Sequence, residues 1–317
     1  MPRAAAWRGA NFTNEMGPGG YGTAESDSAM SDLARAGANA VALVVYGGMA
    51  RQEATVHYGG LRAEESDSSL AHAVRTAHAL GLKVLLKPQI WVWPHTFSGD
   101  LKLSGAAWET FRESYRGFLD HYRDLAIATG AEGLCVGTEL GGLTLEHPDD
   151  WRGLVREARR GYHGLLTYSA NWDHEFEALA FWGELDCIGL SCYFPLRGSG
   201  PEDERRAARD VCERLGQVSR RWKRPVLLTE FGFPSRAGAD AEPWHEIRGA
   251  ADFALQARCA SALLAELRGC PWLEGALWWK WYNSLDPPDS DDVSYAPRGK
   301  PVEKVLREFY RGQAASR

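Results

Sequence analysis

The sequence predicts an α/β fold, a single (β/α)8 TIM barrel spanning residues 1–317. Three observations favour it. Strand-like and helix-like runs alternate along the whole chain, without a composition break that would mark a linker. Long connections follow the strands, whereas the connections that enter strands are short. The chain has 317 residues, enough for one barrel of about 250 residues with insertions.

The predicted strands are short apolar runs bounded by turn residues, a pattern typical of strands buried on both faces. They lie at 8–12, 38–45, 82–90, 133–138, 165–170, 187–191, 225–229 and 275–281. The predicted helices are the amphipathic runs at 26–36, 67–80, 107–129, 149–162, 202–222, 249–268 and 301–310. Gly37 and Gly81 follow two of these helices, where a left-handed residue costs least. Asp149 is a candidate N-cap, and Pro301 can begin the last helix.

The main alternative fold is a doubly wound open sheet, which would need a glycine-rich phosphate turn after its first strand. The segment Gly17-Pro18-Gly19-Gly20 is glycine-rich but lacks the G-x-G-x-x-G spacing, and no G-x-x-x-x-G-K-[ST] motif occurs. We therefore interpret this segment as a flexible first loop of the barrel.

Composition excludes several classes of protein. The net charge of −6 indicates no basic face for nucleic acid and no polybasic membrane anchor. No run approaches the roughly 20 apolar residues of a membrane span. The first residues lack the apolar core of a secretory signal, so we expect a cytoplasmic protein, although an exported protein whose leader has been removed would look the same. We also expect a monomer.

Metal and cofactor chemistry has little support in the sequence. The nine histidines form no H-E-x-x-H or H-x-H motif, and no G-x-S-x-G motif occurs. The acidic segment from Asp286 to Asp292 could offer oxygen ligands to Ca²⁺, but it lacks the EF-hand pattern and we favour a solvated loop. We expect no metal and no cofactor. The six cysteines include no C-x-x-C motif and are expected to be buried thiols.

Two apolar runs end on glutamate, Glu139 after the fourth strand and Glu230 after the seventh. Carboxyl ends of barrel strands are where such enzymes carry their chemistry. If side chains alternate regularly, Glu139 shares a face with Cys135 and Gly137. Glu230 likewise shares one with Val226 and Leu228, so both glutamates can point into the barrel mouth. Hydrolysis of a glycosidic bond needs one carboxyl to protonate the leaving oxygen and one to attack or to activate water. Either glutamate alone could instead be a structural ion-pair partner.

The same strand ends carry a family resemblance. Thr138-Glu139 and Thr229-Glu230-Phe231-Gly232 resemble the acid/base and nucleophile motifs of clan A (β/α)8 glycosidases. The chain is most similar to the family 113 endo-β-1,4-mannanases, in segments at 86–88, 137–140, 166–172, 193–196, 229–232, 279–281 and 299–301. The resemblance implies that Glu139 is the general acid/base and Glu230 the nucleophile, with net retention and carboxyl groups about 5–5.5 Å apart.

Two further site residues rest on this resemblance. Much of the clan has asparagine just before the acid/base, where it contacts the sugar 2-hydroxyl, but this chain has Thr138. Asn171, at the end of the fifth strand, is our candidate for a sugar hydroxyl contact, and an N-cap role is an equal alternative. Tyr193 resembles the clan tyrosine that hydrogen-bonds the nucleophile, although it could simply be an aromatic plug.

Lys87 and Gln89 share the predicted inward face of the third strand with Trp91. A buried lysine is costly unless paired, and a catalytic carboxylate would be its natural partner. Trp279 and Trp281 are predicted to share a face of the eighth strand, and the family pattern favours Trp279 as the floor under the cleaved sugar.

Trp91, Trp93 and Trp172 are predicted to lie on loops after strands, where they would line outer sugar subsites or pack without ligand contact.

The sequence therefore predicts a retaining endo-β-1,4-mannanase acting on mannan, glucomannan or manno-oligosaccharides. An exo-acting β-mannosidase or a β-glucanase on the same barrel remains an alternative, because specificity lies in loops that one sequence does not resolve. A non-catalytic carbohydrate-binding barrel is the alternative from another class. The presence of both glutamates argues against it, since binding alone requires only aromatic rings and hydrogen bonds.

Overall fold

A computed structural model describes residues 7–14, 20–59, 65–94, 96–198, 200–245, 249–286 and 289–311. Except for Gly20, the glycine-rich segment predicted as a flexible first loop lies outside these residues. No helix in the described ranges is both long and apolar enough to cross a membrane.

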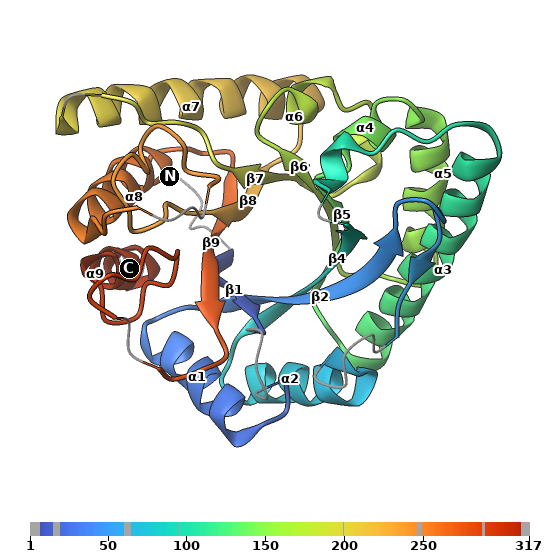
Figure 1. Ribbon diagram of the computed structural model, residues 1–317, viewed down its shortest axis with the longest axis horizontal. Helices are drawn as coiled ribbons and strands as arrows, with labels where there is room; N and C mark the ends of the chain where they lie inside the picture. The colour runs from blue at the N-terminus through green and yellow to red at the C-terminus, as the bar shows by residue number, and fades with distance from the viewer. Residues whose placement is uncertain are drawn as a thin grey trace.

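Eight parallel strands close into a barrel, as the sequence predicts (Figure 1). They are β1 (Trp7–Thr13), β2 (Ala40–Ala50), β4 (Lys83–Trp93), β5 (Gly133–Thr138), β6 (Leu165–Asn171), β7 (Ile188–Cys192), β8 (Val226–Phe231) and β9 (Leu273–Tyr282). The strands pair in the order β1-β9-β8-β7-β6-β5-β4-β2, and pairing of β1 with β2 closes the ring. This confirms the predicted (β/α)8 fold class.

Helices surround the barrel (Figure 1). They are α1 (Ala24–Arg35), α2 (Asp67–Ala79), α3 (Gly105–Thr129), α4 (Gly141–Thr144), α5 (Pro148–Arg159), α6 (Glu175–Ala178), α7 (Pro201–Trp222), α8 (Phe253–Leu267) and α9 (Pro301–Arg311). Gly37 and Gly81 have the positive φ angles expected after α1 and α2. The predicted N-cap at Asp149 is wrong: α5 begins at Pro148 after His147, because proline fits the first helical position.

Two strands are longer than predicted. β2 and β4 continue beyond their expected ends and remain paired as far as Ala50 and Trp93, where β3 (Val56–His57) adds an antiparallel edge to β2. Between β6 and β7, where no helix was predicted, the chain forms the short helix α6 and a single 3-10 turn.

Two layers of apolar side chains hold the barrel. Inside the ring is a small cluster consisting of Trp7, Ala40, Ala42, Leu85, Cys135, Cys187, Leu227 and Leu277. A much larger cluster fills the space between the strands and the surrounding helices. The inner cluster blocks the barrel beneath its mouth, so a site at the carboxyl ends of the strands has a solid floor.

β5, β8 and β9 each carry one extra residue near the carboxyl end, relative to a neighbouring strand. The pairs that reveal it are Cys135–Thr167 and Thr138–Ser169 for β5, Leu190–Leu228 and Ser191–Glu230 for β8, and Ala10–Trp278 and Phe12–Trp281 for β9. Such bulges break the alternation of side chains and re-aim the residues that follow them.

The predicted sharing of faces is wrong in part. Leu228 belongs to the outer cluster, so regular alternation would have turned Glu230 outward with it, and the extra residue of β8 instead allows Glu230 to reach the mouth. In β5, Cys135 lies in the inner cluster, so alternation from Cys135 already turns Glu139 inward. Gly137, which was predicted to share that face, instead faces outward, because a Cβ atom on it would meet Tyr115 and Tyr168 of the outer layer.

Candidate active site

A cavity of about 730 Å³ opens at the carboxyl ends of the strands. Its walls come from strand ends and from the loops that follow β4, β5, β6, β7, β8 and β9. The lining residues are Gln89, Phe97, Glu139, Asn171, Trp172, Asp173, Tyr193, Glu230, Trp244, His245, Trp279 and Tyr295. The two glutamates thus share one cavity, as the sequence predicts for the end of a parallel barrel.

The Glu230 carboxylate is held by three donors from two directions. Lys87, which is fully buried in β4, forms an ion pair with Oε1. Gln89 donates to the same oxygen from 3.2 Å, and the Tyr193 hydroxyl donates to Oε2 from 2.7 Å. Glu230 itself is only 5% exposed, so its orientation is set almost wholly by these contacts.

Glu139 has a very different environment. Its backbone adopts a left-handed conformation with φ of +51°, which a residue with a side chain rarely does. Its nitrogen donates to the Ser169 carbonyl at 2.8 Å. Asn171 donates to the carboxyl oxygen Oε1 from 3.3 Å. Asn171 does not cap a helix, because the residue before α6 is His174. Its side chain lines the cavity, and its Oδ1 accepts a hydrogen bond from the Asp173 nitrogen in an Asx turn.

The two carboxyl groups differ in the charges and hydrogen-bond donors that surround them. Burial, together with the negative charges of Glu230 and Glu175, raises the pKa of Glu139 to about 8, against the opposing effects of Lys87 and the Ser191 hydroxyl. Glu230 has a cation and two polar donors on its oxygens. Hydrogen bonds and a nearby cation favour an ionised carboxylate, whereas burial beside negative charge favours a protonated one. The cavity can therefore offer one proton donor and one anion.

Aromatic rings form most of the remaining wall. Trp279 lies in the cavity with Lys87 Nζ 5.1 Å from its ring centre. Trp172 stacks on Trp244 with ring centres 5.0 Å apart, and Tyr295 lies edge-on to Tyr193 at 6.0 Å. Such faces suit the apolar sides of sugar rings.

Sequence reasoning missed five residues of this wall: Phe97, Asp173, Trp244, His245 and Tyr295. All of them lie in connections that follow strands. Aromatic residues within the long loops predicted after strands were the available signal for three of them, although nothing in the sequence shows which loop residues turn inward.

Trp281 is not a cavity residue, which corrects its predicted contact with sugar. Its ring is 1% exposed, belongs to the outer cluster, and donates to the Ala29 carbonyl of α1 at 3.2 Å. The extra residue in β9 separates its direction from that of Trp279.

Trp91 and Trp93 lie on β4, not on the predicted loop, because this strand is longer than expected. They are 51% and 59% exposed and lie outside the lining of the cavity.

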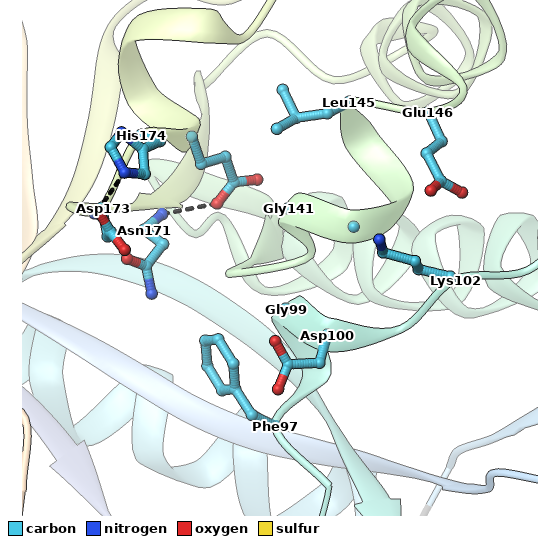
Figure 2. Close-up of a pocket in the computed structure, with 12 residues that line it drawn as sticks. Phe97, Gly99, Asp100, Lys102, Gly141, Leu145, Glu146, Asn171, Asp173 and His174 are labelled. Carbon is cyan, nitrogen blue, oxygen red and sulfur yellow. Dashed lines mark hydrogen bonds and ion pairs between the residues drawn. The ribbon is translucent and has the colours of Figure 1, made fainter.

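A second cavity of about 380 Å³ adjoins the first and shares Phe97, Asn171 and Asp173 with it (Figure 2). Its other walls come from the loop after β4 and from α4, the loop after it and the start of α6. Phe97 and Leu145 are unusually exposed for apolar residues, at 47% and 43%, and both line this cavity. An exposed apolar surface at the edge of a polar cavity is typical of a ligand groove.

The metal hypothesis for the acidic loop gains no support. Asp292 forms an ion pair with the buried Lys300 at 3.1 Å and accepts a hydrogen bond from the Ser294 nitrogen. Over the described ranges, no group of three or more His, Cys, Asp or Glu side chains is placed to hold a metal ion.

A closed parallel barrel has two carboxyl groups in its mouth, one held by a lysine and two polar donors and one whose pKa is raised by burial. This is the architecture of the (β/α)8 glycoside hydrolases. The chain belongs to Glycoside Hydrolase Family 113, whose model matches residues 11–300.

Solved structures agree with this assignment. The GH113 β-mannanase AaManA from Alicyclobacillus acidocaldarius, in complex with ManMIm, is 33% identical with a TM-score of 0.87, over 97% of this chain and 98% of that one. A second GH113 β-1,4-mannanase is 25% identical with a TM-score of 0.85, over 98% and 99% of the two chains. No curated protein sequence matches the chain.

Proposed function

We propose that this chain is a retaining endo-β-1,4-mannanase that cleaves mannan, glucomannan or manno-oligosaccharides, with Glu230 as nucleophile and Glu139 as general acid/base. One observation carries the chemistry: within one cavity, Glu230 is held by Lys87, Gln89 and Tyr193, whereas Glu139 is kept protonated by burial and negative neighbours. The choice of sugar is supported by the 33% identical β-mannanase, which covers nearly the whole chain.

In the first step an oxygen of Glu230 attacks the anomeric carbon as the bond from that carbon to the glycosidic oxygen breaks. Glu139 gives its proton to the departing oxygen, so the leaving sugar departs as an alcohol. Lys87 and Tyr193 hold the attacking carboxylate in place before the reaction. Trp279 offers a flat apolar face to the sugar ring.

In the second step water attacks the anomeric carbon of the glycosyl-enzyme, and Glu139 removes the proton of that water. The bond from the anomeric carbon to Glu230 breaks and the carboxylate is restored. Glu230 is uncharged while it is esterified, so one of the charges that raise the pKa of Glu139 is lost and this pKa falls. Glu139, which has already given up its proton, therefore stays ionised and can accept a proton from the attacking water. Two displacements give net retention.

The second cavity supports endo action. It borders Asn171, whose amide contacts Glu139, and it includes neither Glu230 nor the three donors of Glu230. It therefore extends the groove on the acid/base side, where the leaving part of the chain lies. A polymer occupying this side would place its sugars against Phe97 and Leu145.

The test is hydrolysis of β-1,4-mannohexaose and β-mannan, followed by product sizing and by NMR of the first-formed anomer. We expect a ladder of manno-oligosaccharides and β-anomers that mutarotate later. Mannose as the sole early product would favour the exo-acting β-mannosidase, activity on β-glucan alone would favour a β-glucanase, and α-anomers would remove Glu230 as nucleophile. Inactivity on all β-glycans would favour a carbohydrate-binding barrel.

A further inference from the structure

Glu175, the first residue of α6, has a buried carboxylate that the proposed mechanism does not use. The residue is 2% exposed. Three groups donate to the carboxylate, and none of the three is a cation: Oε1 receives the Tyr168 hydroxyl at 2.6 Å and the Thr144 hydroxyl at 2.8 Å, and Oε2 receives the Asn171 nitrogen at 2.7 Å. Burying a carboxylate is costly, so an arrangement made solely for packing would favour an apolar side chain here.

Two of these contacts lead directly to Glu139. The Tyr168 hydroxyl that donates to Glu175 also accepts a hydrogen bond of 2.7 Å from the nitrogen of Leu140, the residue after Glu139. The backbone nitrogen of Asn171 donates to Glu175, which is the dashed bond at Asn171 in Figure 2. The side-chain amide of Asn171 donates to the Glu139 carboxyl. One carboxylate thus holds both the backbone that follows Glu139 and the amide that contacts its side chain.

Glu139 needs such support because its own conformation is unfavourable. Its φ of +51° is left-handed, a conformation that is unfavourable for a residue with a side chain. It also follows the extra residue of β5, where regular pairing with β6 is interrupted. Such a conformation persists only where the surroundings determine it strongly.

We propose, on the basis of the function proposed above, that Glu175 is a positioning residue for acid/base catalysis, which holds Glu139 in its reactive orientation through Tyr168 and Asn171.

The charges around the two acids support this role. The groups that act on Glu139 are Glu230 of β8, Glu175 of α6, Lys87 of β4 and the Ser191 hydroxyl of β7. Burial raises the pKa of Glu175 to about 7, against hydrogen bonds that lower it. The negative charge of Glu175 raises the pKa of Glu139, so it opposes the loss of the Glu139 proton.

The test is the variant Glu175→Gln, assayed on two substrates and across pH. We expect kcat/KM on mannopentaose to fall by about tenfold or more, within the range that general acid catalysis contributes. On 2,4-dinitrophenyl β-mannobioside, whose leaving group departs without a proton, kcat/KM should change less than about threefold. The alkaline limb of the mannopentaose profile should move to lower pH, because a negative neighbour of Glu139 has been removed.

Two further variants separate positioning from general damage. Tyr168→Phe keeps the Glu175 carboxylate but removes the link to Leu140, and it should give the same split between the two substrates. If Glu175→Gln fails to fold, Tyr168→Phe still tests whether Glu139 is positioned through this network. Thr144→Val is the matched control, since it removes one hydrogen bond to Glu175 but neither link to Glu139. It should leave both substrates within about twofold of wild type.

Equal losses on both substrates, or an unmoved alkaline limb, would overturn the role of Glu175 while leaving the proposed function intact. If the wild-type protein hydrolyses neither substrate, both proposals fail together.

Discussion

The unequal environment of the two carboxyl groups predicts that Glu139→Gln stabilises the fold while it removes activity. Glu139 has a pKa of about 8 in the folded chain, against 4.5 for an ordinary glutamate. Between these values the unfolded chain releases its proton while the folded chain keeps it, so wild-type stability falls as the pH rises. Glutamine does not titrate and escapes this loss.

The size of the effect follows from the same pKa values. At about 1.36 kcal/mol per pKa unit, Glu139→Gln should gain on the order of 3 kcal/mol at pH 7 and roughly 5 kcal/mol above pH 8. The gain should vanish below about pH 4.5, where the carboxyl group is protonated in both states. Urea unfolding at pH 4, 6, 7 and 8 measures this directly.

The control is Glu146→Gln, which changes an exposed carboxylate at the edge of the second cavity. A surface change of this kind should stay within about 0.5 kcal/mol of wild type at each pH. A gain for Glu139→Gln that is the same at pH 4 and pH 8, or a loss at pH 8, would refute the reasoning.

Three other variants probe the cavity. Tyr193→Phe removes a hydrogen bond to a charged group, and its loss of about 1.5–3 kcal/mol should lower kcat/KM on mannopentaose roughly 10- to 150-fold. Lys87→Met leaves Glu230 buried without its cation and should cost about 3 kcal/mol or more in urea unfolding, most of which the double variant with Glu230→Gln recovers. Phe97→Ala should lower kcat/KM on mannohexaose by about threefold or more relative to mannotriose, and shift the cleavage pattern.

Each of these has a result that contradicts it. Tyr193→Phe with full activity would mean that the hydroxyl does not act on the nucleophile. Additive losses in the Lys87 and Glu230 double variant would mean that the pair is not coupled. An unchanged ratio between long and short substrates in Phe97→Ala would place the leaving sugars elsewhere.

The barrel was predictable from the sequence because its signal is repeated along the chain. Every predicted strand is present, since buried parallel strands read as apolar runs whatever their exact ends. The face of β4 was also predictable, because its pairing with β2 is regular and Lys87 and Gln89 alternate inward as expected.

Alternation failed where strands carry an extra residue. In β8 and β9 the directions of Glu230 and Trp281 depend on a one-residue slip against the neighbouring strand. A slip of one residue reverses every side chain that follows, and no local pattern marks it. Glu230 was assigned to the mouth for the wrong geometric reason, and Trp281 was assigned to it in error.

The role proposed for Glu175 could not be predicted from the sequence. Glu175 lies in the connection between β6 and β7, which has no long helix. Its proposed role comes from its contacts with Tyr168 and Thr144, and no sequence pattern indicates these contacts. Burial and hydrogen-bond partners of a single polar residue are decided by tertiary packing, which one sequence does not encode in a readable pattern.

The most direct test of the central claim is to trap the glycosyl-enzyme. A 2-deoxy-2-fluoro β-mannoside with an activated leaving group should form a long-lived ester, and digestion followed by mass spectrometry should find the added mass on the peptide that contains Glu230. Label on Glu139 or on any other residue would contradict the assigned nucleophile. An unlabelled enzyme that turns over manno-oligosaccharides with inversion would contradict the double displacement itself.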